Sequence, residues 1–278
     1  MADDYRQASL GIWEQMAAGW EDDRRAVWEA SRVVGEWLVD ALDPKPGETV
    51  LELAAGVGDT GFAAADRLGP SGRLISTDFS APMIEAARRR ADELGVSNVE
   101  FRTMDAERMD LEEGGVDGVL CRWGYMLMAD PAAALRETRR VLRPGGRVAF
   151  SVWADPEANP WGSVPTRSLI EHTGAKPPDP HAPGIFAMAS EERTRELLDA
   201  AGLRPVRMEH VEMEWNFDSP DDYWRYVMDL AGALAMVIRS MPEREQAAVR
   251  RLTEERLKPV ARPPGYRLAG LCLNVLAE

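Results

Sequence analysis

A glycine-rich turn carries the clearest chemical pattern in the chain. Residues 52–61 read Glu-Leu-Ala-Ala-Gly-Val-Gly-Asp-Thr-Gly, and the glycines Gly56, Gly58 and Gly61 follow a short apolar stretch. Asp78 comes about twenty residues later. A G-x-G-x-x-G turn between a strand and a helix, with an acidic residue at this distance, is typical of a site that binds a nicotinamide or flavin dinucleotide.

Glu52 argues for a different ligand. It lies four residues before Gly56, and a dinucleotide would place its anionic pyrophosphate on the turn, where the carboxylate would repel it. S-adenosylmethionine has no phosphate, and the ammonium at its methionine end suits a carboxylate, directly or through a water. Its ribose hydroxyls still need an acid, which Asp78 supplies. The two carboxylates together favour S-adenosylmethionine over a dinucleotide.

The elements that position these residues alternate between strands and helices. Capping residues such as Ser80 and Asp130 predict where two of the intervening helices begin. Alternation at this spacing predicts a parallel sheet with helices on both faces, which binds its ligands at the carboxyl ends of the strands. The five strands of this region are predicted over 50–53, 73–77, 98–102, 116–121 and 147–153.

The segments on either side of this region are predicted to cover the site. Residues 1–43 are predicted as helices, with Trp13, Met16 and Trp20 at helical spacing. Residues 154–189 are predicted as a long Pro-rich loop that forms a lid, with one short helix around 166–172.

The remainder of the chain is predicted to complete the fold. A helix over 191–201, a strand over 206–217, helices over 220–238 and 240–257 and a strand over 266–276 follow the lid. The predicted organisation has three parts: an N-terminal helical cap, 1–43; a cofactor-binding core, 44–153; and a C-terminal part, 154–278, that contains the lid loop, the cap helices 220–257 and the final strands.

The composition excludes several classes of partner and site. The chain has 33 basic and 47 acidic residues and a net charge of −14, so it lacks the basic surface expected of a nucleic-acid-binding protein. No apolar run approaches the roughly 20 residues of a membrane helix, and the acidic N-terminus does not look like a signal peptide. We therefore expect a cytoplasmic protein. Two cysteines and three histidines without metal-ligand spacing predict no metal site.

Four segments resemble a known family when they are taken together. They are Val50–Gly58, Ser76–Met83, Asp105–Glu107 and Arg140–Gly146. In order and spacing they are similar to the class I S-adenosylmethionine-dependent methyltransferases, in the branch that methylates small molecules and includes the ubiquinone/menaquinone C-methyltransferases. The resemblance covers residues 10–155 closely and the rest loosely. It implies an α/β fold: a doubly wound, mostly parallel seven-stranded Rossmann-like sheet with helical caps at both ends of the chain.

The resemblance also implies which residues hold the adenosine end of S-adenosylmethionine. Asp78 would bind both ribose hydroxyls, and Phe79 and Met83 would flank the adenine. Asp105 would accept a hydrogen bond from the adenine amino group, and the backbone N–H of Ala106 would donate one to a ring nitrogen.

Further roles concern the methionine end and the methyl acceptor. Gly56 and Gly58 would allow close approach to the methionine and ribose, and Ala54 stands where the family usually has glycine. Arg122 would pair with the methionine carboxylate. The N-terminal helix would fold over the cofactor, which places Trp20 at the site. The candidates for the wall of an acceptor pocket are Trp13, Trp123 and Tyr125.

The implied reaction is an in-line SN2 methyl transfer to a small organic acceptor with an apolar or aromatic surface. Positioning and exclusion of water do most of the work in such a transfer. His172, His181 and Tyr125 are the only bases considered, and no catalytic base is assigned. Three alternatives stay open: another enzyme on the same fold, a non-catalytic S-adenosylmethionine-binding protein and, less favoured, a dinucleotide-dependent oxidoreductase.

Overall fold

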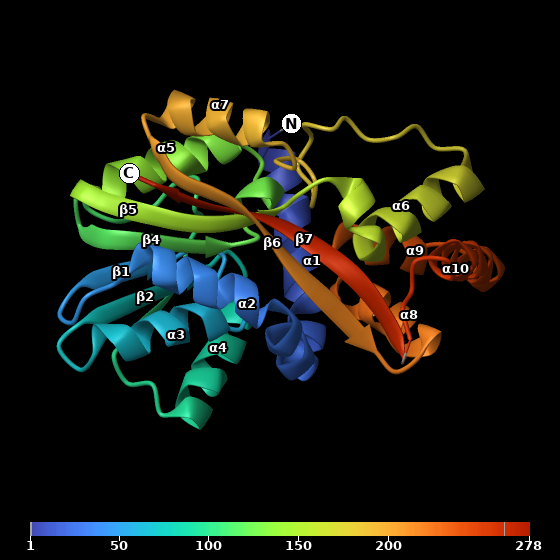
Figure 1. The fold of residues 1–278 in the computed structure, drawn as a ribbon, viewed down its shortest axis with the longest axis horizontal. Helices are drawn as coiled ribbons and strands as arrows, with labels where there is room; N and C mark the ends of the chain where they lie inside the picture. The colour runs from blue at the N-terminus through green and yellow to red at the C-terminus, as the bar shows by residue number, and fades with distance from the viewer. Residues whose placement is uncertain (1, 264) are drawn as a thin grey trace.

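The sheet of this protein has seven strands in the order β3-β2-β1-β4-β5-β7-β6 (Figure 1). The computed structural model describes residues 2–263 and 265–278. Every neighbouring pair runs parallel except the two pairs that involve β7, which is antiparallel to both β5 and β6. This arrangement confirms the predicted α/β fold class. The strands are β1 (Thr49–Glu52), β2 (Arg73–Asp78), β3 (Val99–Thr103), β4 (Val116–Arg122), β5 (Leu142–Trp153), β6 (Pro205–Phe217) and β7 (Tyr266–Ala277).

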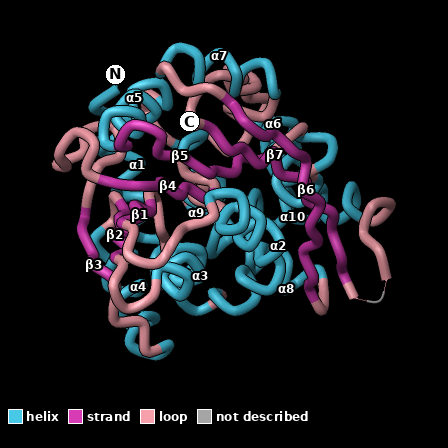
Figure 2. Tube along the Cα trace, turned by 60° about the vertical axis from the view of Figure 1, so that its left-hand side comes forward, coloured by secondary structure: helices cyan, strands magenta, loops and turns pink. Residues whose placement is uncertain are grey.

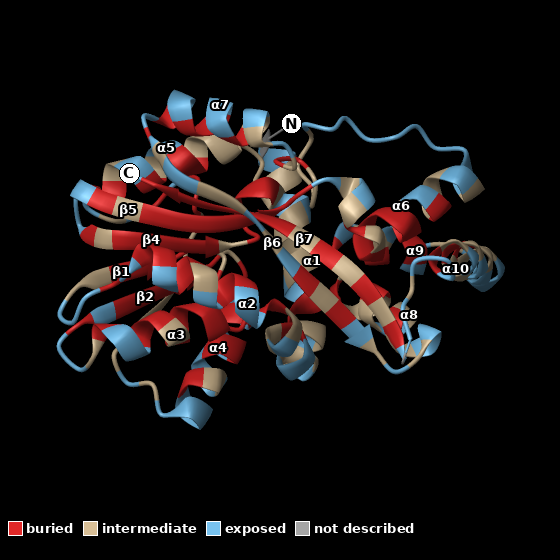
Figure 3. Ribbon diagram, in the orientation of Figure 1, coloured by how far each residue is buried: buried red, intermediate tan, exposed pale blue. Residues whose placement is uncertain are grey.

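Helices cover both faces of the sheet, and this explains why its central strands are apolar on both sides. Leu51 and Val119 pack in the cluster that includes residues of α5 and α7. Val50 and Leu120 pack in the other cluster, with residues of α2, α3 and α4. The buried central strands are visible in Figure 3. The covering helices are α2 (Arg24–Leu42), α3 (Asp59–Leu68), α4 (Ala81–Leu94), α5 (Pro131–Val141) and α7 (Glu191–Ala201).

Helix α1 (Ala2–Asp22) lies across the molecule between the parallel strands and a group of cap helices (Figure 1). The cap helices are α6 (Pro160–Thr173), α8 (Pro220–Leu230), α9 (Ala233–Arg239) and α10 (Glu243–Leu257). Strands β6 and β7 reach beyond the rest of the sheet toward α8 (Figure 2). Helices α8 to α10 follow β6 and precede β7, as predicted. None of the helices described is long and apolar enough to cross a membrane.

The short helix predicted around 166–172 is present but begins earlier, because residues 160–173 form α6, so the prediction of a loop over residues 160–165 is wrong. Pro165 lies inside this helix and leaves the Trp161 carbonyl without its usual helical N–H donor. The hydroxyl of Tyr223 donates to that carbonyl at 2.6 Å and replaces the missing bond. Tertiary packing therefore stabilises a helix that its proline argues against, and the loop proper is 174–189.

The helix predicted over 220–238 is also different, because it divides into α8 and α9. Gly232 separates them with a left-handed φ of 52°, which glycine adopts at little cost. A side chain at Gly232 would lie 3.7 Å from the ring of Trp13 in α1. The break therefore falls where the first helix of the chain packs against the cap.

Candidate active site

The predicted cofactor residues gather at the carboxyl ends of β1 to β4, as the parallel topology requires. Glu52 ends β1, Asp78 ends β2 and Arg122 ends β4. Asp105 follows β3 by two residues. Four segments that are distant in sequence thus share one edge of the sheet.

The turn after β1 depends on left-handed backbone conformations. Ala54, Gly56 and Gly58 have φ angles of 49°, 56° and 89°. Ala54 stands where the resemblance expects glycine, and its conformation is one that non-glycine residues rarely adopt. A side chain at Gly58 would collide with the ring of Phe62 at 2.4 Å, whereas one at Gly56 would meet nothing within 4 Å. The backbone at Gly56 therefore faces open space that a ligand can approach.

Glu52 is buried beneath this turn and braces the start of α3. Its Oε1 accepts a 2.7 Å hydrogen bond from the Gly61 N–H, and its Oε2 accepts one of 2.9 Å from the Ser76 hydroxyl. Any side chain at Gly61 would overlap this carboxylate, which explains the third glycine of the pattern. Burial raises the pKa of Glu52 to about 8, although these hydrogen bonds and Arg122 oppose the shift.

The raised pKa of Glu52 predicts a pH-dependent stability that Glu52→Gln removes. The folded protein holds a proton on Glu52 that the unfolded chain releases above its ordinary pKa of 4.5. The stability from this group is therefore complete below about pH 4.5 and is lost toward pH 8, by up to about 1.4 kcal/mol per pH unit. We expect the unfolding free energy, measured with a denaturant, to fall less between pH 5 and pH 8 in Glu52→Gln than in the parent protein. Equal losses in the two proteins would contradict the buried, protonated carboxyl.

Asp78 ties β2 to the glycine turn. Its Oδ2 accepts from the Gly56 N–H at 2.9 Å and its Oδ1 from the Ser80 N–H at 2.8 Å. Burial raises the pKa of the Asp78 carboxyl in spite of these bonds. Ser80 then caps α4, with its hydroxyl accepting from the Met83 N–H. Asp78 is thus a rigid acceptor whose oxygens keep free lone pairs.

The residues predicted to surround the adenine lie on two neighbouring segments. Phe79 is partly buried and Met83 is buried at the start of α4. Asp105 accepts from the Glu107 N–H at 2.9 Å, and Ala106 between them is buried. The Asp105 carboxylate also lies 3.7 Å from the guanidinium of Arg6 in α1.

Arg122 is a partly buried cation on the same edge. It donates to the hydroxyls of Thr60 at 2.8 Å and Ser31 at 3.2 Å, and its guanidinium lies 4.6 Å from the Trp123 ring centroid. Burial lowers its pKa, and Asp59 and Glu52 are the nearby carboxylates that oppose the shift. In the described part of the chain neither forms an ion pair with Arg122, since Asp59 pairs with Arg90. Arg122 can therefore accept an anionic partner.

The two tryptophans predicted in α1 lie together, with ring centroids 6.3 Å apart. Trp20 packs against the main core cluster, and its buried indole N–H has no hydrogen-bond acceptor among the described residues. Trp13 lies by Gly232, where α8 and α9 meet. Of the two tryptophans, Trp20 is therefore the one whose indole N–H could donate to a ligand.

Trp123 and Tyr125 separate in the structure. Trp123 has a left-handed φ of 62° and stacks on Trp153 with centroids 4.3 Å apart. Tyr125 is completely buried, bonded through its hydroxyl to Thr138 of α5 and packed edge-on against Phe150. Trp123 is also buried, and its N–H donates to Cys272. We keep it as a candidate for the acceptor wall because the Arg122 guanidinium lies over its ring, and we omit Tyr125, which is fully enclosed.

An aromatic group that the sequence did not single out continues from Trp123. Trp153 ends β5, Trp161 begins α6, Trp215 lies in β6 and Tyr226 in α8, and neighbouring centroids are 4.3 to 5.5 Å apart. The buried N–H of Trp215 has no acceptor. Only the position of Trp153 at a strand end could have indicated this group in advance.

The histidines considered as bases lie elsewhere. His172 of α6 contacts Glu245 of α10, and His181 is exposed in the 174–189 loop. Both cysteines are buried, and burial raises the pKa of each thiol to about 12. Among the described residues no cluster of potential metal ligands is present.

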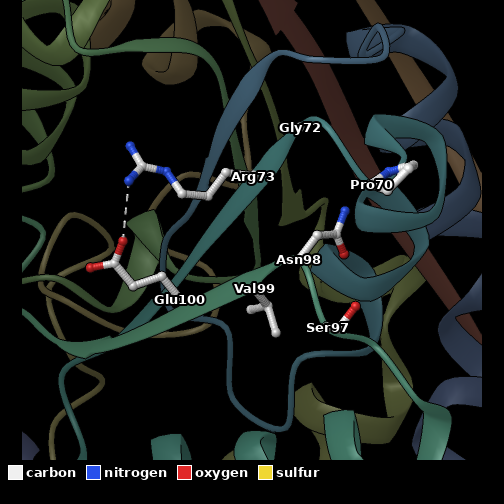
Figure 4. A pocket seen from close by; sticks show the side chains of 7 residues that line it. All are labelled: Pro70, Gly72, Arg73, Ser97, Asn98, Val99 and Glu100. Atoms are coloured by element: carbon white, nitrogen blue, oxygen red, sulfur yellow. Dashed lines mark hydrogen bonds and ion pairs between the residues drawn. The ribbon is translucent and has the colours of Figure 1, made fainter.

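A cavity of about 310 Å³ opens at the other end of the sheet (Figure 4). Arg73 and Glu100, 3.4 Å apart, lie beside each other there. Because β2 and β3 begin at this cavity, it lies opposite the glycine turn and is separate from the candidate site. Its lining residues are Pro70, Gly72, Arg73, Ser97, Asn98, Val99 and Glu100.

The strand order and the edge just described define the class I methyltransferase fold. Residues 44–173 match a family model described as a methyltransferase domain. This match covers just under half of the chain and includes the glycine turn and the residues that follow β2, β3 and β4.

The chain is similar to several curated proteins, of which the second and third described here are named methyltransferases. An uncharacterized 37.1 kDa protein in a transposon of Streptomyces fradiae is 40% identical over 51% of this chain and 39% of its own length. The nocamycin O-methyltransferase of Saccharothrix syringae is 29% identical over 67% of this chain and 70% of its own. A ubiquinone/menaquinone biosynthesis C-methyltransferase of Pseudomonas savastanoi pv. phaseolicola is 35% identical over 45% and 49%. The chain therefore spans less than two thirds of the length of two of these three relatives.

Solved structures share the fold at low identity. The YcgJ protein of Bacillus subtilis has a TM-score of 0.58 at 17% identity, over 87% of this chain and 96% of that one. The [4+2]-cyclase SpnF has a TM-score of 0.54 at 18% identity, over 88% and 78%.

Proposed function

We propose that this protein transfers a methyl group from S-adenosylmethionine to a small organic acceptor. The observation that carries the proposal is the charge pattern around the glycine turn. Glu52 holds a proton in the ligand-free protein and would ionise beside the ammonium of a methionine, and the nearby guanidinium of Arg122 would take the methionine carboxylate. Asp78 supplies an acceptor for ribose hydroxyls one strand away.

Several residues at this edge have the chemistry that this cofactor requires. Gly56 leaves open space beside the turn, and Phe79 and Met83 offer apolar and polarizable surface to an adenine. Asp105 and the backbone N–H of Ala106 would complete the adenine contacts, and Ala54 and Gly58 shape the turn itself. Trp20 would cover the cofactor from α1.

The chain's own residues act by binding and positioning. A bound S-adenosylmethionine supplies an electrophilic sulfonium methyl group. Glu52, Arg122 and Asp78 would fix the two ends of the cofactor, so that the methyl group points toward the acceptor. Trp123 would present an aromatic face near the sulfonium charge. Helix α1 and the 174–189 loop would exclude water.

The aromatic group supports an acceptor with an apolar or aromatic surface. Trp123, Trp153, Trp161, Trp215 and Tyr226 form a continuous set of rings that packs in the main core cluster. Where this set borders the site, it would favour flat or apolar ligands over strongly charged ones. Trp13 remains a candidate for its outer edge. Quinone biosynthesis and nocamycin in the names of relatives fit such an acceptor. The net charge of −14 argues against a nucleic acid.

Calorimetry tests this function directly. We expect S-adenosylmethionine and S-adenosylhomocysteine to bind with micromolar Kd, about −8 kcal/mol, and NAD and NADP to give no heat. The physical reason is that the methionine ammonium would favour the charged form of Glu52, whereas a pyrophosphate on the turn would bring a second negative charge to that carboxyl. Transfer of labelled methyl to a panel of phenols, quinols and carboxylic acids then separates a methyltransferase from a protein that only binds the cofactor. Tight NADP binding without binding of S-adenosylhomocysteine would overturn the proposal.

A further inference from the structure

The first two turns of α1 contact both segments that border the adenine side of the site. The Tyr5 hydroxyl donates to the Leu127 carbonyl at 3.0 Å, in the segment after β4. Arg6 contacts Asp105 and Glu107, in the segment after β3. One short stretch of helix thus links two loops that approach each other only in the folded protein.

Glu107 is the centre of this contact. Its side chain is only 3% exposed, and it accepts hydrogen bonds from the N–H groups of Ala129 at 2.8 Å and Asp130 at 3.1 Å. Arg6 is its cationic partner, and this bond to Glu107 is the main reason that the pKa of Arg6 is raised. A buried carboxylate that loses its cation is strongly disfavoured, so this pair resists separation.

The same guanidinium extends to the cofactor side. Its Nε lies 3.7 Å from Asp105 Oδ2 and is buried without a hydrogen-bond acceptor. The charge of Arg6 therefore acts on the carboxylate assigned to the adenine amino group. At the other end of α1, Glu21 forms a two-point contact with Arg89 of α4 at 2.8 and 2.7 Å. Helix α1 is thus fastened on both sides of the proposed adenosine site.

We propose that Arg6 is a positioning residue of the cofactor site, which holds α1 closed over the adenosine end through Glu107 and orients Asp105 toward the adenine. The proposal rests on the proposed function, because it takes Asp105 as the adenine acceptor. It adds that the cofactor enters and leaves when the contact between Arg6 and Glu107 opens. The rate of exchange is then set by a residue that does not touch the reacting methyl group.

The test is the dissociation rate of S-adenosylhomocysteine, measured by stopped-flow tryptophan fluorescence. Arg6→Met keeps the apolar stem and removes the charge, and we expect dissociation to be about tenfold faster or more and affinity to fall in proportion. Arg6→Lys keeps a cation for Glu107 and should recover part of the loss. The control is Arg195→Met, because Arg195 is 50% exposed and forms an ion pair with Glu191 of its own helix α7; its rate should equal that of the parent.

The outcomes separate this proposal from the proposed function. A parent protein that binds no S-adenosylhomocysteine overturns both. A parent that binds, with Arg6→Met dissociating at the parent's rate, overturns the role of Arg6 alone. If Arg6→Met does not fold, hydrogen exchange of residues 3–12 in the parent decides: protection that rises with the ligand supports the closed helix, and unchanged protection contradicts it.

Discussion

Removal of residues 1–20 is expected to reduce methyl transfer by about a hundredfold or more while the sheet stays folded. In our proposal helix α1 covers the edge of the sheet that carries Glu52, Asp78 and Asp105, and its loss would admit water there. The strands pair with one another and not with α1, although α1 packs against the covering helix α4 and buries its own Met16. Activity with saturating cofactor and far-ultraviolet circular dichroism measure the two parts of this expectation.

A peptide of residues 1–22 provides the control for this deletion. If α1 acts by covering the site, the added peptide should restore part of the activity to the shortened chain. In the intact protein, S-adenosylhomocysteine should lower hydrogen exchange in α1 and in the 174–189 loop, as expected of a cover that opens to admit ligands. The prediction would be contradicted if the shortened protein kept full activity and the ligand did not change hydrogen exchange in the intact protein. Trp13 and Trp20 would then have only a packing role.

Replacement of Asp78 by alanine should lower cofactor affinity by about tenfold or more, because it removes charge-assisted contacts to the ribose hydroxyls. At the sequence level Asp78 is a strand-end residue whose loss leaves the fold intact. The structure adds a second effect, since the buried carboxylate also accepts from Gly56 and Ser80. We therefore expect a loss of unfolding free energy of about 1–3 kcal/mol as well. Titration calorimetry and urea unfolding measure these effects separately.

Asp78→Asn separates the two roles. The asparagine oxygen can still accept from one backbone N–H, so stability should fall less than in Asp78→Ala. The negative charge is absent in both variants, so both should bind S-adenosylhomocysteine weakly. Parent-like affinity in either variant would show that Asp78 supports the turn and does not hold the ribose.

Local sequence was sufficient for the parallel half of the fold. The glycine turn, the apolar strands and the caps at Ser80 and Asp130 act within a few residues of one another, so their signals survive in a single sequence. Once the strands are parallel, their carboxyl ends share an edge. This geometry alone brings Glu52, Asp78 and Arg122 together, and it is why residues far apart in the chain could be assigned to one site.

Contacts between distant segments determined the parts of the fold that local sequence did not predict. Residues 160–173 become a helix because Tyr223 supplies the hydrogen bond that Pro165 removes. Tyr125 lies in the core, where its hydroxyl shares a hydrogen bond with the hydroxyl of Thr138. Trp123, two residues earlier, packs in the aromatic group. The pairing of Arg6 with Glu107 spans 101 residues. The sequence by itself thus determined the class of fold and the edge of the sheet to which the cofactor residues were assigned. Only the tertiary structure decided which aromatic rings meet and which helix packs beside the proposed site. The reason is that those contacts join segments with no local pattern in common.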